Sequence, residues 1–136
     1  MEFLFMVWVM DYNCSIDFVQ APFLVRRRQS HNLNDRNRSR EVLRLDLMEK
    51  TSRLYRDADV IVFNSWHWWN HEKTSRGENY YQEGSFVYLK LETIEAYKKA
   101  LTTWGRWVDK NIDVNRTQVV FRGYSVKTSA SVLFLT

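Results

Sequence analysis

The chain has 136 residues, 45% of them hydrophobic and 26% charged, which is typical of one soluble globular domain and excludes a disordered chain. Its net charge of +4 would suit an anionic partner, but six of its arginines lie in one polar stretch, residues 26–40, so the excess is local. The single cysteine, Cys14, excludes an internal disulfide and cannot hold a metal ion alone.

The N-terminal part predicts two strands, at residues 1–10 and 15–25, joined by a turn in which Asp11 and Asn13 supply suitable side chains. Pro22 interrupts the second apolar run, which is typical of an edge or bulged strand. The first run is too short to cross a bilayer, which takes ~20 residues, and it lacks the basic start and cleavage site of a signal peptide. We therefore expect a core strand here and no targeting segment.

The basic stretch at residues 26–40 has no hydrophobic periodicity. Such a stretch could bind nucleic acid, but no Phe, Tyr or Trp interrupts it to stack on bases. We therefore expect a solvated loop and no nucleic-acid partner.

The next segment leads into a buried strand. We expect a short extended piece at residues 42–45, a helix at residues 46–56, a turn at residues 57–59 and a strand at residues 60–63. The order helix, turn, buried strand is that of a parallel α/β sheet.

The residues after this strand are rich in rings, since three of the six tryptophans and two of the three histidines fall between Trp66 and His71. α/β proteins place ligand sites just past the carboxyl ends of strands, so residues 64–73 predict a site. A Trp-rich corner of the core is the alternative. The polar loop that follows, residues 73–84, carries Tyr80, Tyr81 and Gln82.

The C-terminal part predicts a short strand at residues 86–89, a helix at residues 93–112 with Thr93 as N-cap, and a buried strand at residues 118–122. One face of the helix is apolar and consists of Ile94, Tyr97, Leu101, Trp104, Val108 and Ile112. Residues 126–136 contain no cluster from which we predict a site.

The Trp-rich segment could support acyl-transfer chemistry. The side-chain amide of Asn64 could donate to a developing oxyanion, with His67 or His71 as a base. These histidines are spaced i, i+4, but no third ligand has suitable spacing, so we expect no metal site. Ser65 lies in neither a Gly-x-Ser-x-Gly nor a Gly-Asp-Ser setting, and nothing marks it as an activated nucleophile.

The same segment could instead recognise carbohydrate. Aromatic rings pack against sugar C–H surfaces, and nearby polar side chains could bind hydroxyl groups. The polar candidates are Asn70, Glu72, Lys73 and Gln82.

Four segments together resemble the plant trichome birefringence-like proteins: DYNCSIDFVQAPFLV, LRLDLMEKTSRLYRDADV, VIVFNSWHWWNHEKTSRGENYYQEG and ALTTWGRWVDKNIDVNRTQVVFRGYS. They lie within residues 11–125 and follow the family's order. The resemblance implies a polysaccharide O-acetyltransferase of the plant Golgi lumen, related to the SGNH/GDSL esterases. Such an enzyme passes an acetyl group from acetyl-CoA or an acetyl carrier to xylan, mannan or pectin, with no other cofactor. Its membrane anchor would lie outside this chain.

The resemblance also implies an α/β fold. We expect a single partial PC-esterase-like domain over residues 1–136, a three-layer SGNH-like sandwich with a mostly parallel sheet, truncated at both ends. The family's Gly-Asp-Ser and Asp-x-x-His blocks do not occur in the sequence. We therefore expect a catalytically incomplete relative of a xylan-type O-acetyltransferase, with a non-catalytic carbohydrate-binding remnant as the alternative.

By resemblance, Asn64 is the oxyanion-hole residue, and the substrate-binding residues are His67, Trp68, Trp69, Tyr80, Tyr81 and Gln82. Three Asn-x-Ser/Thr sequons are glycosylation candidates in a lumenal protein: Asn13, Asn37 and Asn115. A partial domain also exposes strand edges and apolar faces, so we expect a tendency to aggregate.

Overall fold

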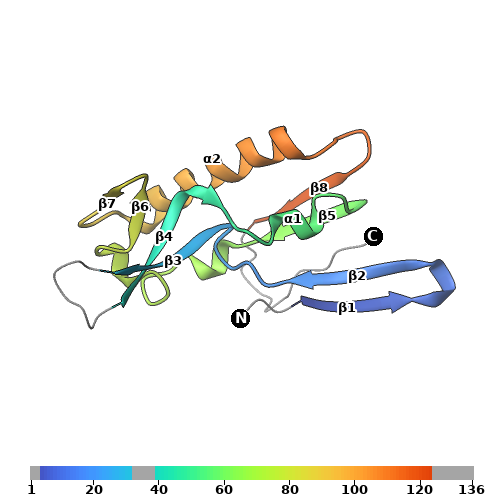
Figure 1. Ribbon diagram of the computed structural model, residues 1–136, viewed down its shortest axis with the longest axis horizontal. Coiled ribbons are helices and arrows are strands. Elements are labelled where there is room, and N and C mark those ends of the chain that lie inside the picture. The colour runs from blue at the N-terminus through green and yellow to red at the C-terminus, as the bar shows by residue number, and fades with distance from the viewer. Residues whose placement is uncertain (1–3, 32–38, 124–136) are drawn as a thin grey trace.

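A computed structural model of the protein describes residues 4–31 and 39–123 (Figure 1). The strands are β1 (Leu4–Val9), β2 (Cys14–Val19), β3 (Val25–His31), β4 (Ser39–Met48), β5 (Val60–Asn64), β6 (Tyr81–Glu83), β7 (Phe86–Val87) and β8 (Gln118–Arg122). The α-helices are α1 (Ser52–Tyr55) and α2 (Thr93–Asn111), and the 3-10 turns are η1 (Met10–Tyr12), η2 (Trp66–Trp68) and η3 (Ser75–Gly77). The sequon at Asn37 and the tail at residues 126–136 lie outside the described residues.

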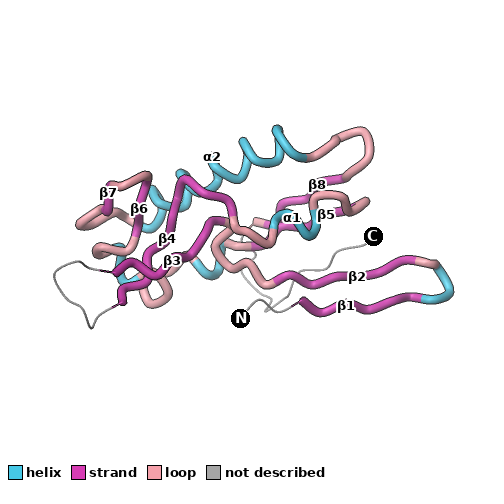
Figure 2. Tube along the Cα trace, viewed as in Figure 1, coloured by secondary structure: helices cyan, strands magenta, loops and turns pink. Residues whose placement is uncertain are grey.

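The described strands form three sheets, ordered β1–β2, β3–β4–β6–β7 and β5–β8 (Figure 2). β4 pairs parallel with β6, and β5 pairs parallel with β8. The pairs β1–β2, β3–β4 and β6–β7 are antiparallel. The expectation of a mostly parallel sheet is therefore wrong for these residues, because consecutive strands joined by short connections can only pair antiparallel. The fold is mixed α/β.

Residues 26–31 belong to strand β3, so the expectation of a loop there is wrong. β3 pairs with β4 along its length, with Arg27 opposite Leu43 and Gln29 opposite Glu41. It lies at the edge of the four-stranded sheet, where charged side chains discourage pairing with another chain. The apolar residues that stabilise this pairing come mainly from its partner, which is why β3 shows no hydrophobic pattern of its own.

Strand β4 extends to Met48, so the helix expected at residues 46–56 shortens to the four residues of α1. Val25 pairs with Met48, and the backbone N–H of Glu49 donates to the carbonyl of Leu24 at 2.9 Å. These pairings hold the chain extended up to the turn, because tertiary contacts override local helix preference.

Helix α2 confirms the expected helix at residues 93–112, and β5 confirms the expected buried strand at residues 60–63. The strand expected at residues 118–122 is present as β8, but it is not buried, because each of its residues is half-buried or exposed. Glu92, rather than Thr93, occupies the N-cap. The apolar side of α2 covers both the four-stranded sheet and the β5–β8 pair (Figure 1). Ile94 is an exception to the predicted face, because 47% of it is exposed. Among the described residues, no helix combines the length and apolarity needed to cross a membrane.

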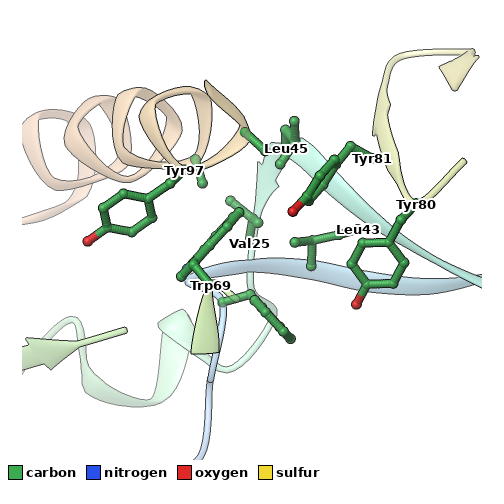
Figure 3. Packing of buried hydrophobic residues seen from close by; sticks show 10 residues of the cluster. Val25, Leu43, Leu45, Trp69, Tyr80, Tyr81 and Tyr97 are labelled. Atoms are coloured by element: carbon green, nitrogen blue, oxygen red, sulfur yellow. The ribbon is translucent and has the colours of Figure 1, made fainter. Parts of the chain in front are cut away.

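In the part of the chain that the structure describes, the core consists of two clusters that meet at Leu101 of α2 and Phe121 of β8. The first lies between α2 and the four-stranded sheet, and Figure 3 shows Trp69 between the rings of Tyr97 and Tyr81. The second lies under the β5–β8 pair and is centred on buried residues that include Leu24, Tyr55, Ile61, Phe63 and Ile112.

The β1–β2 hairpin extends away from α2 and the larger sheet (Figure 2). Phe5, Met6 and Trp8 are between 57% and 64% exposed, so the expectation of a core strand at residues 1–10 is wrong. Within the described residues β1 has only β2 as a strand partner, and a two-stranded ribbon cannot bury both of its faces. Exposed apolar surface was expected of a partial domain, and this hairpin presents it.

Candidate functional site at the carboxyl edge of β5 and β8

The parallel pair β5–β8 sets the position of Asn64. The Cα partners along this pair run from Val60 and Gln118 to Asn64 and Arg122, so both strands end together. Two hydrogen bonds align their beginnings. The Thr117 hydroxyl donates to the Ala58 carbonyl at 2.7 Å, and the backbone N–H of Gln118 donates to the Asp59 carbonyl at 2.8 Å.

Asn64 is half-buried as the last residue of β5. The carboxyl ends of parallel strands are where α/β folds assemble ligand sites, since the chain there turns out of the sheet into loops. The structure therefore places Asn64 at the carboxyl edge of a parallel strand pair, opposite Arg122, and its role in an oxyanion hole stays a prediction.

Ser65 follows at once, and its hydroxyl is committed to the fold. It donates to the carbonyl of Pro22 at 2.6 Å and accepts from the indole N–H of Trp69 at 2.9 Å. Ser65 is fully buried, and Trp69 is 4% exposed. These two hydrogen bonds secure the η2 turn to the segment before β3, and they agree with the prediction that Ser65 is not an activated nucleophile.

The η2 turn presents His67 and Trp68 at the surface, with His67 exposed and Trp68 half-buried. The Lys73 ammonium lies over the Trp68 ring at 5.5 Å from its centroid, and the rings of Trp68 and Phe23 make an edge contact with centroids 6.4 Å apart. Trp68 is therefore held in place while part of it stays accessible. Among the described residues, no group of three or more His, Cys, Asp or Glu side chains could hold a metal ion.

Trp69, Tyr80 and Tyr81, also predicted to bind substrate, pack in the core. Tyr81 is fully buried and Tyr80 is 4% exposed. The rings of Trp69 and Tyr81 are nearly parallel, with centroids 6.3 Å apart (Figure 3). The Tyr80 hydroxyl donates to Glu41 at 3.1 Å, and burial raises the pKa of Tyr80 well above its ordinary value. In this structure these three side chains are buried core residues next to the η2 turn and do not line an accessible site.

Gln82 is half-buried in β6, between β4 and β7 of the four-stranded sheet. Its side-chain amide donates to the Gly84 carbonyl at 2.8 Å and stabilises the turn between β6 and β7. The structure thus brings Asn64, His67 and Trp68 to one local segment, while Gln82 lies with a different group of residues.

Sequence reasoning missed the two residues that position the η2 turn from outside it. Pro22 supplies the carbonyl that binds Ser65, and Phe23 makes edge contacts with both Trp68 and Trp69. The sequence predicts an edge or bulged strand at these residues, but β2 ends at Val19, and an apolar Pro-Phe pair does not reveal a long-range partner. The sequons at Asn13 and Asn115 are both exposed.

Comparison with known proteins identifies the class to which these features belong. Residues 2–131 match the PC-Esterase family, described as the GDSL/SGNH-like acyl-esterase family found in Pmr5 and Cas1p, and the chain belongs to this family.

Named relatives from Arabidopsis thaliana narrow the similarity to one branch. Protein trichome birefringence-like 1 is 56% identical over 116 residues, which is 85% of this chain and 20% of that protein. Protein trichome birefringence is 56% identical over 115 residues, 85% of this chain and 19% of that protein, and Protein trichome birefringence-like 4 is 48% identical over 116 residues. The chain spans about a fifth of the length of the first two relatives, at 20% and 19%.

Proposed function

We propose that this chain supplies the supporting wall of an acyl-transfer site in a cell-wall polysaccharide O-acetyltransferase of the xylan type. The observation that carries the proposal is the position of Asn64 at the carboxyl edge of a parallel strand pair, in a chain of an acyl-esterase family. The proposal extends to a three-layer SGNH-type sandwich for the longer domain and to a Golgi-lumenal location.

The proposed chemistry is acetyl transfer in two steps. A serine attacks the carbonyl carbon of the acetyl donor while a histidine takes the serine proton, and the negative charge that develops on the carbonyl oxygen is stabilised by donated hydrogen bonds. The Asn64 amide would donate one of these hydrogen bonds. The bond to the donor's leaving group, such as the thiol of CoA, then breaks, the leaving group takes the proton from the histidine, and an acetyl-serine remains. A sugar hydroxyl then attacks the acetyl-serine, with its proton taken by a histidine, and the serine is released.

The serine and the histidine of this scheme belong to Gly-Asp-Ser and Asp-x-x-His blocks, which the 136 residues do not contain. The buried Ser65 cannot replace the serine, because its hydroxyl is already bound on both sides. We therefore propose that these residues alone do not transfer acetyl groups. His67 and the partly exposed Trp68 of the η2 turn, with Lys73 beside the Trp68 ring, offer the aromatic surface and polar groups that support polysaccharide as the partner.

Calorimetry with xylotetraose and an acetyl-transfer assay with acetyl-CoA test these statements on the same sample. We expect binding without transfer, and Trp68→Ala should abolish the binding. Trp8→Ala is the matched control, because it removes a 57% exposed indole from the distant hairpin. Acetylated product from the wild-type chain would overturn the proposed incompleteness, and absence of binding would overturn the proposed substrate contact.

The role of Asn64 needs the reacting residues. In a protein assembled from this chain and the Gly-Asp-Ser and Asp-x-x-His blocks of a relative, Asn64→Ala should lower kcat by roughly 10²–10³-fold. KM should change little, because the amide acts on charge that develops in the transition state. Asn115→Ala, at an exposed remote position, is the control. An equal loss in both variants would contradict the oxyanion role.

The second candidate function, carbohydrate binding without catalysis, rests on the same accessible face of Trp68. It differs in one outcome. If the assembled protein binds xylotetraose but transfers no acetyl group, the non-catalytic function is the correct one.

A further inference from the structure

The loop that joins α2 to β8 contains the sequon Asn115-Arg116-Thr117 (Figure 1). The first and third residues of this sequon have opposite environments, because Asn115 is exposed whereas Thr117 is only 4% exposed. N-glycosylation needs both side chains, since the asparagine accepts the sugar and the hydroxyl at the third position identifies the sequon. The folded chain therefore offers the acceptor and buries the recognition group.

The Thr117 hydroxyl is bound to a segment that is distant in the sequence. It donates to the Ala58 carbonyl at 2.7 Å, in the turn that precedes β5. The backbone N–H of the next residue, Gln118, donates to the Asp59 carbonyl at 2.8 Å, and the parallel pairing of β8 with β5 starts there. The hydroxyl is therefore released only when the beginning of the β5–β8 pair opens.

The backbone of the sequon is also held in the loop. The Asp113 carbonyl accepts hydrogen bonds from the N–H groups of Arg116 at 3.0 Å and Thr117 at 2.8 Å, and the Asp113 carboxylate accepts from the N–H of Asn115 at 3.0 Å. The Arg116 guanidinium donates to the Asp57 carbonyl and lies 3.9 Å from the Asp57 carboxylate. An enzyme that draws this sequon into its own site has to break these contacts together with the buried one.

The modification itself is a transfer from a lipid-pyrophosphate-linked oligosaccharide. The Asn115 amide nitrogen forms a bond to the anomeric carbon of the sugar, and the bond from that carbon to the pyrophosphate oxygen breaks. The amide proton passes to a base of the transferase, and the lipid pyrophosphate leaves. The fold can carry the product, because Asn115 is exposed and its neighbour Val114 is 76% exposed.

We propose that Asn115 is glycosylated only before β8 pairs with β5, and that this pairing then closes the sequon. The Thr117 hydroxyl has two successive partners, first the transferase and then the Ala58 carbonyl. Because β5 ends at Asn64, sugar transfer to Asn115 precedes assembly of the candidate site. This order rests on the lumenal location proposed above, since oligosaccharide transfer takes place in the secretory pathway.

A sequon moved by one residue is the matched control. Both test chains carry Asn13→Gln/Asn37→Gln, so that one sequon remains in each. The first keeps the native sequon, and the second carries Val114→Asn/Asn115→Gln/Arg116→Thr. In the second chain the recognition hydroxyl stands at the position of Arg116, whose side chain is 52% exposed, while Thr117 keeps its bond to Ala58.

Each chain is offered to the transferase before and after folding. In the first arm it is translated behind a secretory leader in the presence of microsomes. In the second arm the folded chain, produced in bacteria without glycosylation, is incubated with purified oligosaccharyltransferase and lipid-linked oligosaccharide. A gel shift that an endoglycosidase removes measures the product, and circular dichroism with urea unfolding checks that both chains are folded.

We expect both sequons to be modified in the first arm and the shifted sequon alone to be modified readily in the second. On the folded chain the native sequon should react at least about tenfold more slowly than the shifted one, which corresponds to an opening free energy of about 1.4 kcal/mol or more.

Three outcomes would overturn the proposal. Equal rates for the two folded chains mean that burial of the Thr117 hydroxyl is no barrier. Modification of both chains in the first arm and of neither in the second means that the loop, and not this hydroxyl, closes the sequon. A native sequon that stays unmodified in the first arm means that Asn115 is not a glycosylation site.

The lumenal location has its own test, because the leader directs both test chains into microsomes. Chain isolated from plant tissue should carry an endoglycosidase-sensitive glycan. If Asn115 is modified in microsomes but no sequon of the plant chain carries a glycan, the location is wrong and the order of events is still supported.

Discussion

The indole N–H of Trp69 donates to the Ser65 hydroxyl at 2.9 Å, and that hydroxyl donates in turn to the Pro22 carbonyl at 2.6 Å. This chain of two hydrogen bonds links the turn after β5 to the segment that precedes β3. It keeps Trp69 in the core and thereby leaves Trp68 and His67 on the surface side of the turn.

Ser65→Ala should destabilise the protein by about 2 kcal/mol, because the Trp69 indole and the Pro22 carbonyl both lose a buried partner. Urea unfolding monitored by tryptophan fluorescence measures the change. Ser85→Ala, at an exposed position, is the matched control and should cost little. A loss for Ser65→Ala below about 0.5 kcal/mol would show that water replaces the hydroxyl without penalty.

Alanine substitutions at Gly77 and Gly84 separate the cost of a positive φ from the cost of steric overlap. Both have φ in the left-handed region, at 73° and 56°, but a Cβ on Gly77 would overlap the carbonyl oxygen of Leu91, whereas nothing lies near Gly84. Gly84→Ala should cost about 1 kcal/mol from backbone strain alone. Gly77→Ala should cost about 3 kcal/mol or more, or prevent folding, because the backbone of Gly77 or of Leu91 must also move. Thermal unfolding of the two variants tests this, and equal losses would contradict the overlap.

Asp46 should make stability depend on pH at the acidic end. The hydrogen bonds from Arg44, assisted by the Gly84 N–H, hold the pKa of Asp46 at about 2, below its ordinary value of 3.8. Because the pKa is lowered, the pair with Arg44 stabilises the fold fully at pH values above 3.8, and this contribution is lost as the pH falls toward about 2.

Asp46→Asn should therefore cost about 1 kcal/mol at pH 7, after allowance for solvent screening of a side chain that is partly exposed, and much less near pH 2. Urea unfolding at several pH values measures the difference between the variant and the wild type. Asp109→Asn, an exposed carboxylate on α2, should show no such convergence. A difference that stays constant with pH would contradict the ion-pair origin.

Thr117 aligns β8 with β5 and hence Arg122 with Asn64. Thr117 is 4% exposed, and its hydroxyl donates to the Ala58 carbonyl. Thr117→Val keeps the shape but removes the donor, so it should cost about 1–2 kcal/mol, whereas Thr117→Ser keeps the donor. If the serine variant loses more in urea unfolding than the valine variant, packing rather than the hydrogen bond sets this position.

The exposed apolar side chains of β1 should promote association. Met6 is 58% exposed and lies opposite Asp17. Met6→Lys should reduce aggregation, because it charges an open strand and offers a cross-strand partner to that carboxylate. Light scattering against protein concentration measures the effect. Val114→Lys, at an exposed loop residue, changes the net charge equally and should help less.

Burial distinguishes between the two interpretations that the sequence allows for the Trp-rich segment. The Trp-rich segment predicted either a site or a corner of the core, and the structure contains both within one turn. Both rings contact Phe23, but Trp69 also packs against the rings of Tyr81 and Tyr97 and is 4% exposed, whereas Trp68 lies under Lys73 and stays partly accessible. Adjacent residues in a short 3-10 turn point in different directions, and residue type alone cannot assign them.

The sequence by itself determined the elements whose signal is local and strong. The long helix α2 was predicted because its apolar residues repeat with the helical period, and the strands β5 and β8 were predicted because each contains a short, continuous apolar run. The family was predicted as well, because several segments keep their residues and their order.

Only the tertiary structure decided which partner each strand takes. The arginines of β3 form a strand because β4 supplies the buried side chains, and residues 46–48 stay extended because Val25 pairs with Met48. Pairing between strands depends on residues distant in the chain, and it contributes free energy that no local pattern records. For the same reason Ser65, which stands beside Asn64 in the sequence, proved to be a buried hydrogen-bonding residue of the fold.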